Sequence, residues 1–200
     1  IGYCKTSQKV PGEDTWKSDK RDKRIGLENK NMKGRIIVPV RAEFGGIVAF
    51  LARSPVPEEK GWWNTKFDKH NNMFLFDVAR KDIYQNDNVY LVEGPMDAFV
   101  LRQEVLLNVC CMMGVGLGYR IIGIIKRYCN NVCLCFDSDA NQSGQNARDR
   151  SIYELSDFDF GKISTINLPI GEDPNEYVLR NCLGEFLELE TVLSKKEIKT

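Results

Sequence analysis

The 200-residue sequence predicts an α/β protein in which helices flank a parallel β-sheet. Three observations predict this fold. From residue 89 onward, short apolar runs alternate with segments of helical periodicity, as in sheets built from β-α-β units. The apolar runs at 89–92 and 132–136 lead directly into carboxylates, which places acids at the carboxyl edge of the sheet. The preceding residues are more polar and contain one β-hairpin pattern, which predicts a smaller mixed α/β subdomain.

The expected N-terminal subdomain, residues 1–87, is basic at its start. Its clearest feature is a hairpin, with strands at 35–41 and 47–51 on either side of a Gly-Gly turn. Residues 1–41 contain eleven Lys or Arg and five Asp or Glu. This balance favours a surface that holds a polyanion, and a solvated surface of mixed charge is the alternative.

The expected central domain, residues 88–170, alternates strands and helices. Apolar strands of this kind indicate a parallel sheet covered on both faces, with right-handed crossovers. The strands are expected at 89–93, 109–113, 132–136 and 162–168, and the helices at 96–104, 119–128 and 144–155. Residues 171–200 are expected to form a helical tail, with helices at 175–180 and 184–193.

Three carboxylates are expected to meet at the carboxyl edge of this sheet. Glu93 ends one strand, and Asp137 and Asp139 follow another. Oxygen ligands suit Mg²⁺, which keeps several waters that phosphate can displace. Two such ions can activate a 3′-hydroxyl and stabilise a pyrophosphate leaving group. Glu93 is alternatively a general base, and the Asp-x-Asp pair is alternatively only a helix N-cap.

Two neighbouring features are compatible with such a site. Asp97 lies on the first turn of the helix after Glu93, where it either adds a ligand or caps the helix and orients the site. The glycines at 114, 116 and 118 predict a tight turn that lines the site. A dinucleotide-binding fingerprint is the less favoured interpretation, because the spacing is not GxGxxG.

Composition argues against several other classes of protein. The seven cysteines form no CxxC pair and the chain has one histidine, so no zinc site is expected. An odd number of cysteines, mostly within apolar runs, indicates buried thiols in a reducing compartment such as the cytoplasm. No apolar run reaches 18 residues, so no membrane span is expected.

Four segments carry a resemblance to a known family. Glu93–Ala98 is similar to an EGxxD motif, and Phe136–Asp139 to a DxD motif, of the TOPRIM domain. Residues 168–177 resemble the stretch that follows the last TOPRIM strand in bacterial and phage DnaG-type DNA primases, and residues 34–53 resemble the hairpin segment ahead of it. The resemblance covers roughly residues 34–182 and implies a Rossmann-like TOPRIM sheet. Asn175 departs from the pattern, because many primases have a second Asp there.

The resemblance implies metal-dependent, template-directed synthesis of RNA primers on single-stranded DNA. The catalytic residues it implies are Glu93, Asp137 and Asp139. The ligands it implies for Mg²⁺ or Mn²⁺ are Glu93, Asp97, Asp137, Asp139 and Asp173. The residues expected to contact the template or the ribonucleoside triphosphates are Arg35, Arg41, Arg53, Lys66 and Lys69.

The same resemblance implies partners and leaves alternatives open. The chain begins with Ile1, so we expect a fragment whose zinc-binding part and helicase-contacting part lie elsewhere, and a replicative helicase as partner through those parts. The expected setting is a bacterial or phage-infected cell. The alternatives are a TOPRIM nuclease and a non-catalytic module that binds single-stranded DNA. A topoisomerase is disfavoured, because it needs a nucleophilic tyrosine on another large domain.

Overall fold

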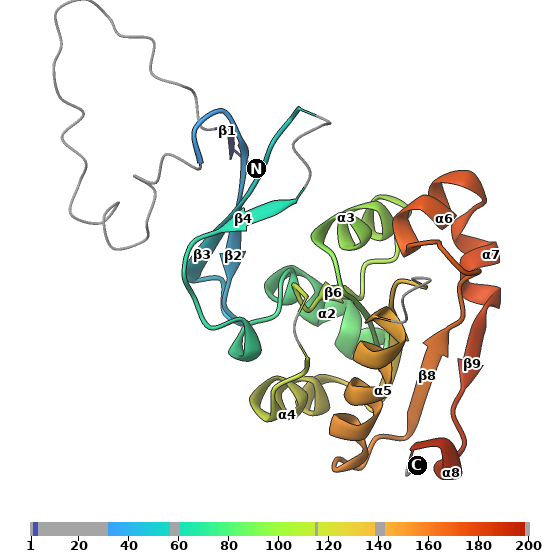
Figure 1. The fold of residues 1–200 in the computed structure, drawn as a ribbon. Helices are drawn as coiled ribbons and strands as arrows, with labels where there is room; N and C mark the ends of the chain where they lie inside the picture. The colour runs from blue at the N-terminus through green and yellow to red at the C-terminus, as the bar shows by residue number, and fades with distance from the viewer. Residues whose placement is uncertain (1, 4–31, 57–60, 115, 139–142, 199–200) are drawn as a thin grey trace, which may run out of the picture. The chain divides into compact units, whose positions relative to one another are not determined.

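The computed structural model describes residues 2–3, 32–56, 61–114, 116–138 and 143–198. The chain divides into two compact units, Ile1–Asp68 and Lys69–Thr200. Figure 1 shows the elements of both. None of the helices in the described part of the chain is long and apolar enough to cross a bilayer.

The first unit is an antiparallel sheet with the strand order β1-β2-β3-β4. Its strands are β1 (Gly2–Tyr3), β2 (Ile36–Arg41), β3 (Ile47–Arg53) and β4 (Trp62–Asn64). The predicted hairpin is thus confirmed, with Val38 opposite Leu51 and Val40 opposite Ala49. These four side chains are buried and lie on one face, because directly opposed residues share a face of a sheet.

The second unit contains a five-stranded sheet with the order β6-β5-β7-β8-β9. All neighbours are parallel except β9, which is antiparallel to β8. The strands are β5 (Asn88–Val92), β6 (Val109–Cys111), β7 (Asn131–Cys135), β8 (Lys162–Ile166) and β9 (Glu190–Val192). The helices are η2 (Lys69–Asn71), α2 (Phe76–Asn86), α3 (Pro95–Gln103), α4 (Tyr119–Tyr128), α5 (Ser143–Ser156), α6 (Pro174–Arg180), α7 (Leu183–Glu188) and α8 (Lys195–Ile198).

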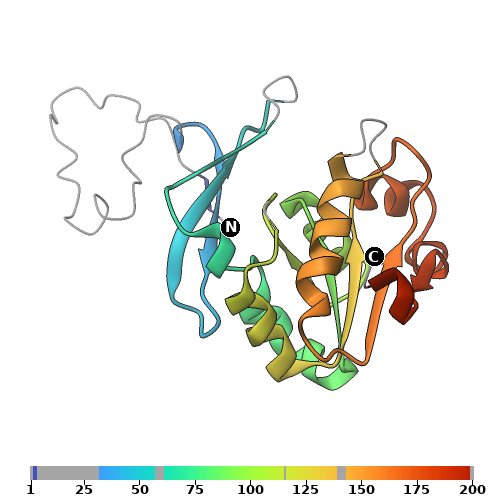
Figure 2. The ribbon, with the colours of Figure 1, turned by 60° about the horizontal axis from the view of Figure 1, so that its bottom comes forward.

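Two layers of helices enclose this sheet. Helices α2, α4 and α5 cover one face (Figure 2). They bury a core with alternate strand residues such as Leu91 and Leu134. On the other face, α3 packs against β6 and α6. Cys110, Cys111, Cys129, Cys133 and Cys135 are free and buried, as the sequence predicts. Burial raises the pKa of the Cys129 thiol to about 12, so this thiol stays protonated at neutral pH.

The order of the strands creates a switch point between β5 and β7. From β5 the chain passes through α3 to β6 on one side, and from β7 it passes through α5 to β8 on the other side. Helices that leave two adjacent strands in opposite directions open a crevice outside the carboxyl ends of those strands, where ligands of α/β proteins bind.

The structure differs from the sequence-based expectation at two borders. Helix α2 belongs to the second unit, because Phe76, Ala79 and Ile83 are part of its core, so the first unit is shorter than the expected subdomain 1–87. In the tail, the helix expected at 184–193 ends at Glu188, and residues 190–192 form β9. Two β-branched residues, Thr191 and Val192, favour this strand.

Strand β9 is anchored by one carboxylate. Glu190 Oε1 accepts hydrogen bonds from Lys162 Nζ at 2.7 Å and from Ser164 Oγ at 2.6 Å. Burial acts to raise the pKa of Glu190, but the bonds from Lys162 and Ser164 outweigh it and leave the pKa lowered. The folded protein therefore favours the ionised form of this group.

We expect Glu190→Gln to lower the stability of the chain by about 1 kcal/mol at pH 7, because a partly buried ion pair is lost. A lowered folded pKa gives stability that is present above the unfolded value of 4.5 and is lost as the pH falls through the folded pKa. Thermal melting of both proteins should therefore differ at pH 7 and converge below pH 4.5. The exposed Glu188→Gln should melt like the parent at both pH values.

Candidate active site at the carboxyl edge of the parallel sheet

Glu93 lies at the switch point, directly after β5. Val92, the last residue of β5, is in register with Cys135 of β7 and Cys111 of β6. The main chain of Glu93 is fixed, because its carbonyl oxygen accepts bonds from Gly114 N at 3.2 Å and from Cys111 Sγ at 3.1 Å. Its Oε1 atom is shielded from solvent.

Asp137 follows β7 on the neighbouring strand, two residues beyond the register partner of Val92. The next residue, Ser138, donates from its amide to the carbonyl of Glu172 at 2.9 Å and accepts from the amide of Gly171 at 2.5 Å. These two bonds hold the turn after β7 against the loop after β8. The structure thus brings Glu93 and Asp137 to adjacent strand ends, whereas Asp139 lies outside the described residues.

Asp97 connects two helices at this edge. Its Oδ2 accepts from the amide of Gly94 at 3.1 Å, and its Oδ1 accepts from Asn175 Nδ2 at 3.0 Å and from the Asn175 amide at 3.3 Å. The carboxylate therefore caps α3 and links it to α6. Burial raises the pKa of Asp97, although the bonds from Asn175 act in the opposite direction. As a metal ligand, Asp97 stays a prediction.

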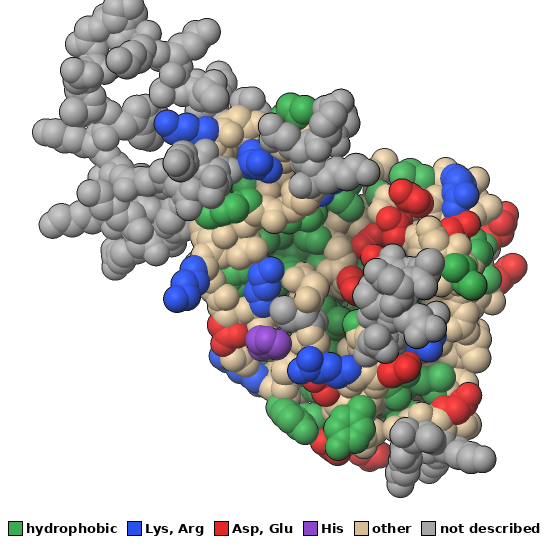
Figure 3. Space-filling model, in the orientation of Figure 1, with side chains coloured by type: hydrophobic (Ala, Val, Ile, Leu, Met, Phe, Trp, Pro, Cys, Tyr) green, Lys and Arg blue, Asp and Glu red, His purple; other side chains and the backbone are tan. Residues whose placement is uncertain are grey.

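Asp173 and Glu172 lie on the loop before α6. Asp173 is the N-cap of that helix, since its Oδ1 accepts from the Glu176 amide at 2.7 Å. Glu172 Oε2 lies 2.6 Å from Arg180 Nη2. Figure 3 shows acidic side chains gathered over α3, α6 and α7, whereas the Lys and Arg side chains in this view are spread over both units. Asp173 as a ligand also stays a prediction.

The donor set fits a hard divalent cation. Glu93 and Asp137 supply carboxylate oxygens, which Mg²⁺ and Mn²⁺ prefer over softer ligands. Within the described residues, no group of three or more His, Cys, Asp or Glu has metal-binding geometry. A site built on Glu93 and Asp137 therefore needs a further ligand, and Asp139 is the predicted one.

A hollow of about 380 Å³ opens next to Glu93. Its described lining comprises Glu93, His70, Met112, Gly114, Gly116, Ala147 and Arg150. Gly114 has a φ of +75°, which a glycine adopts without strain. The predicted tight turn is thus present at Gly114, and it borders this hollow. Asp137 lines a second hollow of about 190 Å³, together with Arg148 and Asn167.

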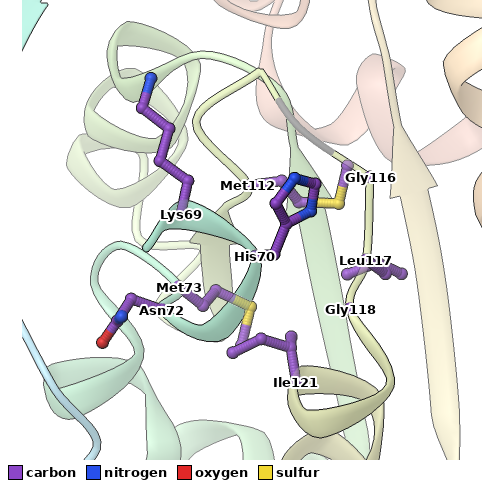
Figure 4. A pocket seen from close by; sticks show the side chains of 9 residues that line it. All are labelled: Lys69, His70, Asn72, Met73, Met112, Gly116, Leu117, Gly118 and Ile121. Carbon is purple, nitrogen blue, oxygen red and sulfur yellow. The ribbon is translucent and has the colours of Figure 1, made fainter. Parts of the chain in front are cut away.

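A smaller pocket of about 10 Å³ lies beside the first hollow, where η2 packs on the loop 116–118 (Figure 4). The His70 ring lies near Met112 and Gly116, whereas the Lys69 side chain extends away from Met73 and Ile121. A Cβ atom at position 118 would overlap the His70 carbonyl oxygen, so the close approach of η2 requires glycine there.

One comparison identifies this unit. Residues 90–178 match the Toprim-like family model. The second unit carries a TOPRIM domain. Glu93 and Asp137 are the acids at two strand ends of that domain, and Asp97 holds its first helix in place.

The TOPRIM domain and the residues around it are similar to bacterial DNA primases. The Thermotoga maritima DNA primase is 32% identical over 161 residues, which cover 78% of this chain and 28% of the relative. The Enterococcus faecalis DNA primase is 31% identical over 177 residues, which cover 81% of this chain and 28% of the relative. The chain thus spans little more than a quarter of the length of these relatives.

Solved structures confirm the fold. The Aquifex aeolicus primase, with zinc-binding and RNA polymerase domains, gives a TM-score of 0.74 at 24% identity, over 86% of this chain and 44% of that one. A DnaG catalytic core gives a TM-score of 0.77 at 21% identity, over 96% of this chain and 66% of that one.

The predicted basic residues lie in both units. Lys69 belongs to the TOPRIM unit, where its Nζ lies 3.5 Å from the Met113 carbonyl oxygen. In the first unit, Arg53 lies over the Trp62 ring at 5.7 Å, and the register places both on one face. Arg41 is the last residue of β2, where the register with β3 shifts, and its Nη1 donates to Gly45 O at 2.8 Å. The remaining two are Arg35, just before β2, and Lys66, which is exposed.

His70 and Arg150 line the hollow beside Glu93 and are not among the site residues predicted from the sequence. The position of Arg150 could have been predicted from the sequence. Ala147, Arg150 and Glu154 follow the Asp-x-Asp motif at helical spacing and therefore share a face of α5. No sequence pattern predicts the position of His70, since only the packing of η2 on the loop 116–118 brings it to the hollow.

Proposed function

We propose that this chain is the catalytic core of a DNA primase, which synthesises short RNA primers on single-stranded DNA by metal-dependent nucleotidyl transfer. The observation that supports this most is the placement of Glu93 and Asp137 at the switch point of a TOPRIM domain. The similarity to bacterial DNA primases selects primer synthesis among the reactions that such acids can support.

The proposed roles follow from the positions of the side chains. Glu93 and Asp137, with Asp139, would hold Mg²⁺ or Mn²⁺, and Asp97 and Asp173 are proposed to complete or orient the set. The chemistry that such an ion supplies is activation of a 3′-hydroxyl and stabilisation of a pyrophosphate leaving group. The bonds of Ser138 to the loop 171–172 keep the acidic turn in place without reorganisation during the reaction.

The basic residues would bind the phosphates of the substrates. We assign Arg35, Arg41, Arg53, Lys66 and Lys69 to the template strand and the ribonucleoside triphosphates. A replicative helicase is the proposed partner through parts of the protein outside this sequence.

A single assay separates this function from its alternatives. The chain is incubated with labelled ribonucleotides, single-stranded DNA and Mg²⁺ or Mn²⁺. Short oligoribonucleotides that depend on template and metal are the expected product. Cleavage of the DNA without ribonucleotides would instead identify a nuclease, and DNA binding without either product would identify a binding module.

A further inference from the structure

The hollow beside Glu93 contains one side chain that the proposed mechanism does not use. Arg150 projects from α5 and lines this hollow with Glu93 and His70. Its side chain is 66% exposed, so a ligand in the hollow can reach it. Of the described residues that line the hollow, it is the one that carries a permanent positive charge.

The guanidinium of Arg150 is held in a defined position. Its Nε atom donates to Glu154 Oε1 at 3.0 Å, one helical turn further along α5. The Glu154 side chain is 15% exposed, so the anchor is largely buried. The main chain closes the other side, because a Cβ atom at Gly116 would lie 3.2 Å from Arg150 Nε.

An arginine held through Nε keeps its terminal NH₂ groups for another acceptor. The planar group presents donors in a rigid fork that matches two oxygens of a phosphate, and anchoring reduces the entropy lost on binding. The hollow thus combines a fixed phosphate donor with the Glu93 carboxylate, which is the proposed ligand of a divalent cation.

The size and charge of the hollow favour a small anion as its ligand over a strand of nucleic acid. A single-stranded nucleic acid is held by a row of cations and stacking aromatic rings. The described lining offers one arginine, one histidine and no Phe, Tyr or Trp within about 380 Å³. A polyphosphate that contacts Arg150 and a metal ion on Glu93 fits these dimensions.

We propose that Arg150 is a further phosphate-binding residue of this site and that it takes the triphosphate tail of a nucleotide. The proposal rests on the proposed function only for the identity of the ligand, since the binding itself needs no template and no reaction.

The test is calorimetric titration of the chain with inorganic tripolyphosphate in the presence of Mg²⁺. We expect Arg150→Gln to weaken binding about tenfold, the loss that corresponds to one charge-assisted hydrogen bond. Arg150→Lys keeps the charge but loses the fork, and about threefold weaker binding is expected. Arg127→Gln is the matched control, because Arg127 lies near the end of α4 that leads to the amino end of β7, at the opposite edge of the sheet. It should bind within about twofold of the parent.

Three results would overturn the proposal: tripolyphosphate binding by Arg150→Gln equal to the parent, no binding by the parent at millimolar concentration, or an equal loss in Arg127→Gln. A loss of oligothymidylate binding with unchanged tripolyphosphate binding would also overturn it and assign Arg150 to the strand. Thermal melting of each variant shows whether it is folded. If Arg150→Gln does not fold, the binding measured for Arg150→Lys decides the test. If the parent chain makes no primers but binds tripolyphosphate, and Arg150→Gln weakens that binding, the proposed function is refuted and the role of Arg150 in phosphate binding is supported.

Discussion

Glu93→Gln is expected to reduce template-dependent primer synthesis at least about a hundredfold, because even residues that only orient a metal ligand cost ten- to a hundredfold when replaced. Gln has the shape of Glu but no charge, so the variant removes a hard anionic ligand and fills the same space. Glu93 sits where its main chain is fixed by Gly114 and Cys111. A change of side-chain charge should therefore leave the melting temperature nearly unchanged.

The expected loss is specific to the edge of the sheet that holds the acids. Glu104→Gln removes the same charge at the C-terminal end of α3, where the chain returns to the amino ends of the strands. It should keep primer synthesis within about twofold of the parent. The affinity for Mn²⁺, measured by titration, should be weaker in Glu93→Gln and unchanged in Glu104→Gln. Full activity of a folded Glu93→Gln variant would contradict the assignment of Glu93 as a metal ligand.

Local patterns in the sequence were sufficient to predict that Glu93 and Asp137 follow strands of the parallel sheet. Apolar runs that end in Glu93 and in Asp137 predict strands with acids at one edge, because parallel strands of a β-α-β sheet share their carboxyl ends. The strands and the acids that follow them are therefore evident from the local sequence. The register of Val92 with Cys135 joins residues that are far apart in the chain, and the sequence analysis did not predict it.

Local sequence patterns do not predict contacts between segments that are far apart in the chain. Asp97 and Asn175 are 78 residues apart, and nothing in either local sequence indicates that they form a pair. Strand β9 is three residues long and depends on the contacts of Glu190 with Lys162 and Ser164. Similarly, the expected subdomain 1–87 includes the residues of α2, because the local sequence does not show that Phe76, Ala79 and Ile83 pack into the core of the second unit.

Asp97→Ala is expected to destabilise the second unit by about 3 kcal/mol, which combines the loss of a helix cap with buried donors left without an acceptor. Asp97 is 4% exposed, and its carboxylate accepts hydrogen bonds from the Gly94 amide and from two donors of Asn175. For a unit of this size, the melting temperature should fall by roughly 10 °C. Primer synthesis should also decline at temperatures where the variant is folded, because α3 and the loop before α6 both border the acidic edge.

Gly94→Ala should reproduce part of this effect without touching the carboxylate itself. The backbone at Gly94, with φ −99° and ψ 146°, accommodates alanine, but the added Cβ would lie 2.5 Å from Asp97 Oδ2 and displace it. We expect a loss of about 2 kcal/mol, since the bonds to Asn175 are disturbed with the cap. In the Asp97→Ala background the same change meets no carboxylate and should cost little. Denaturant unfolding of the two single variants and the double variant measures this coupling, and strictly additive losses would show that Asp97 does not link Gly94 to α6.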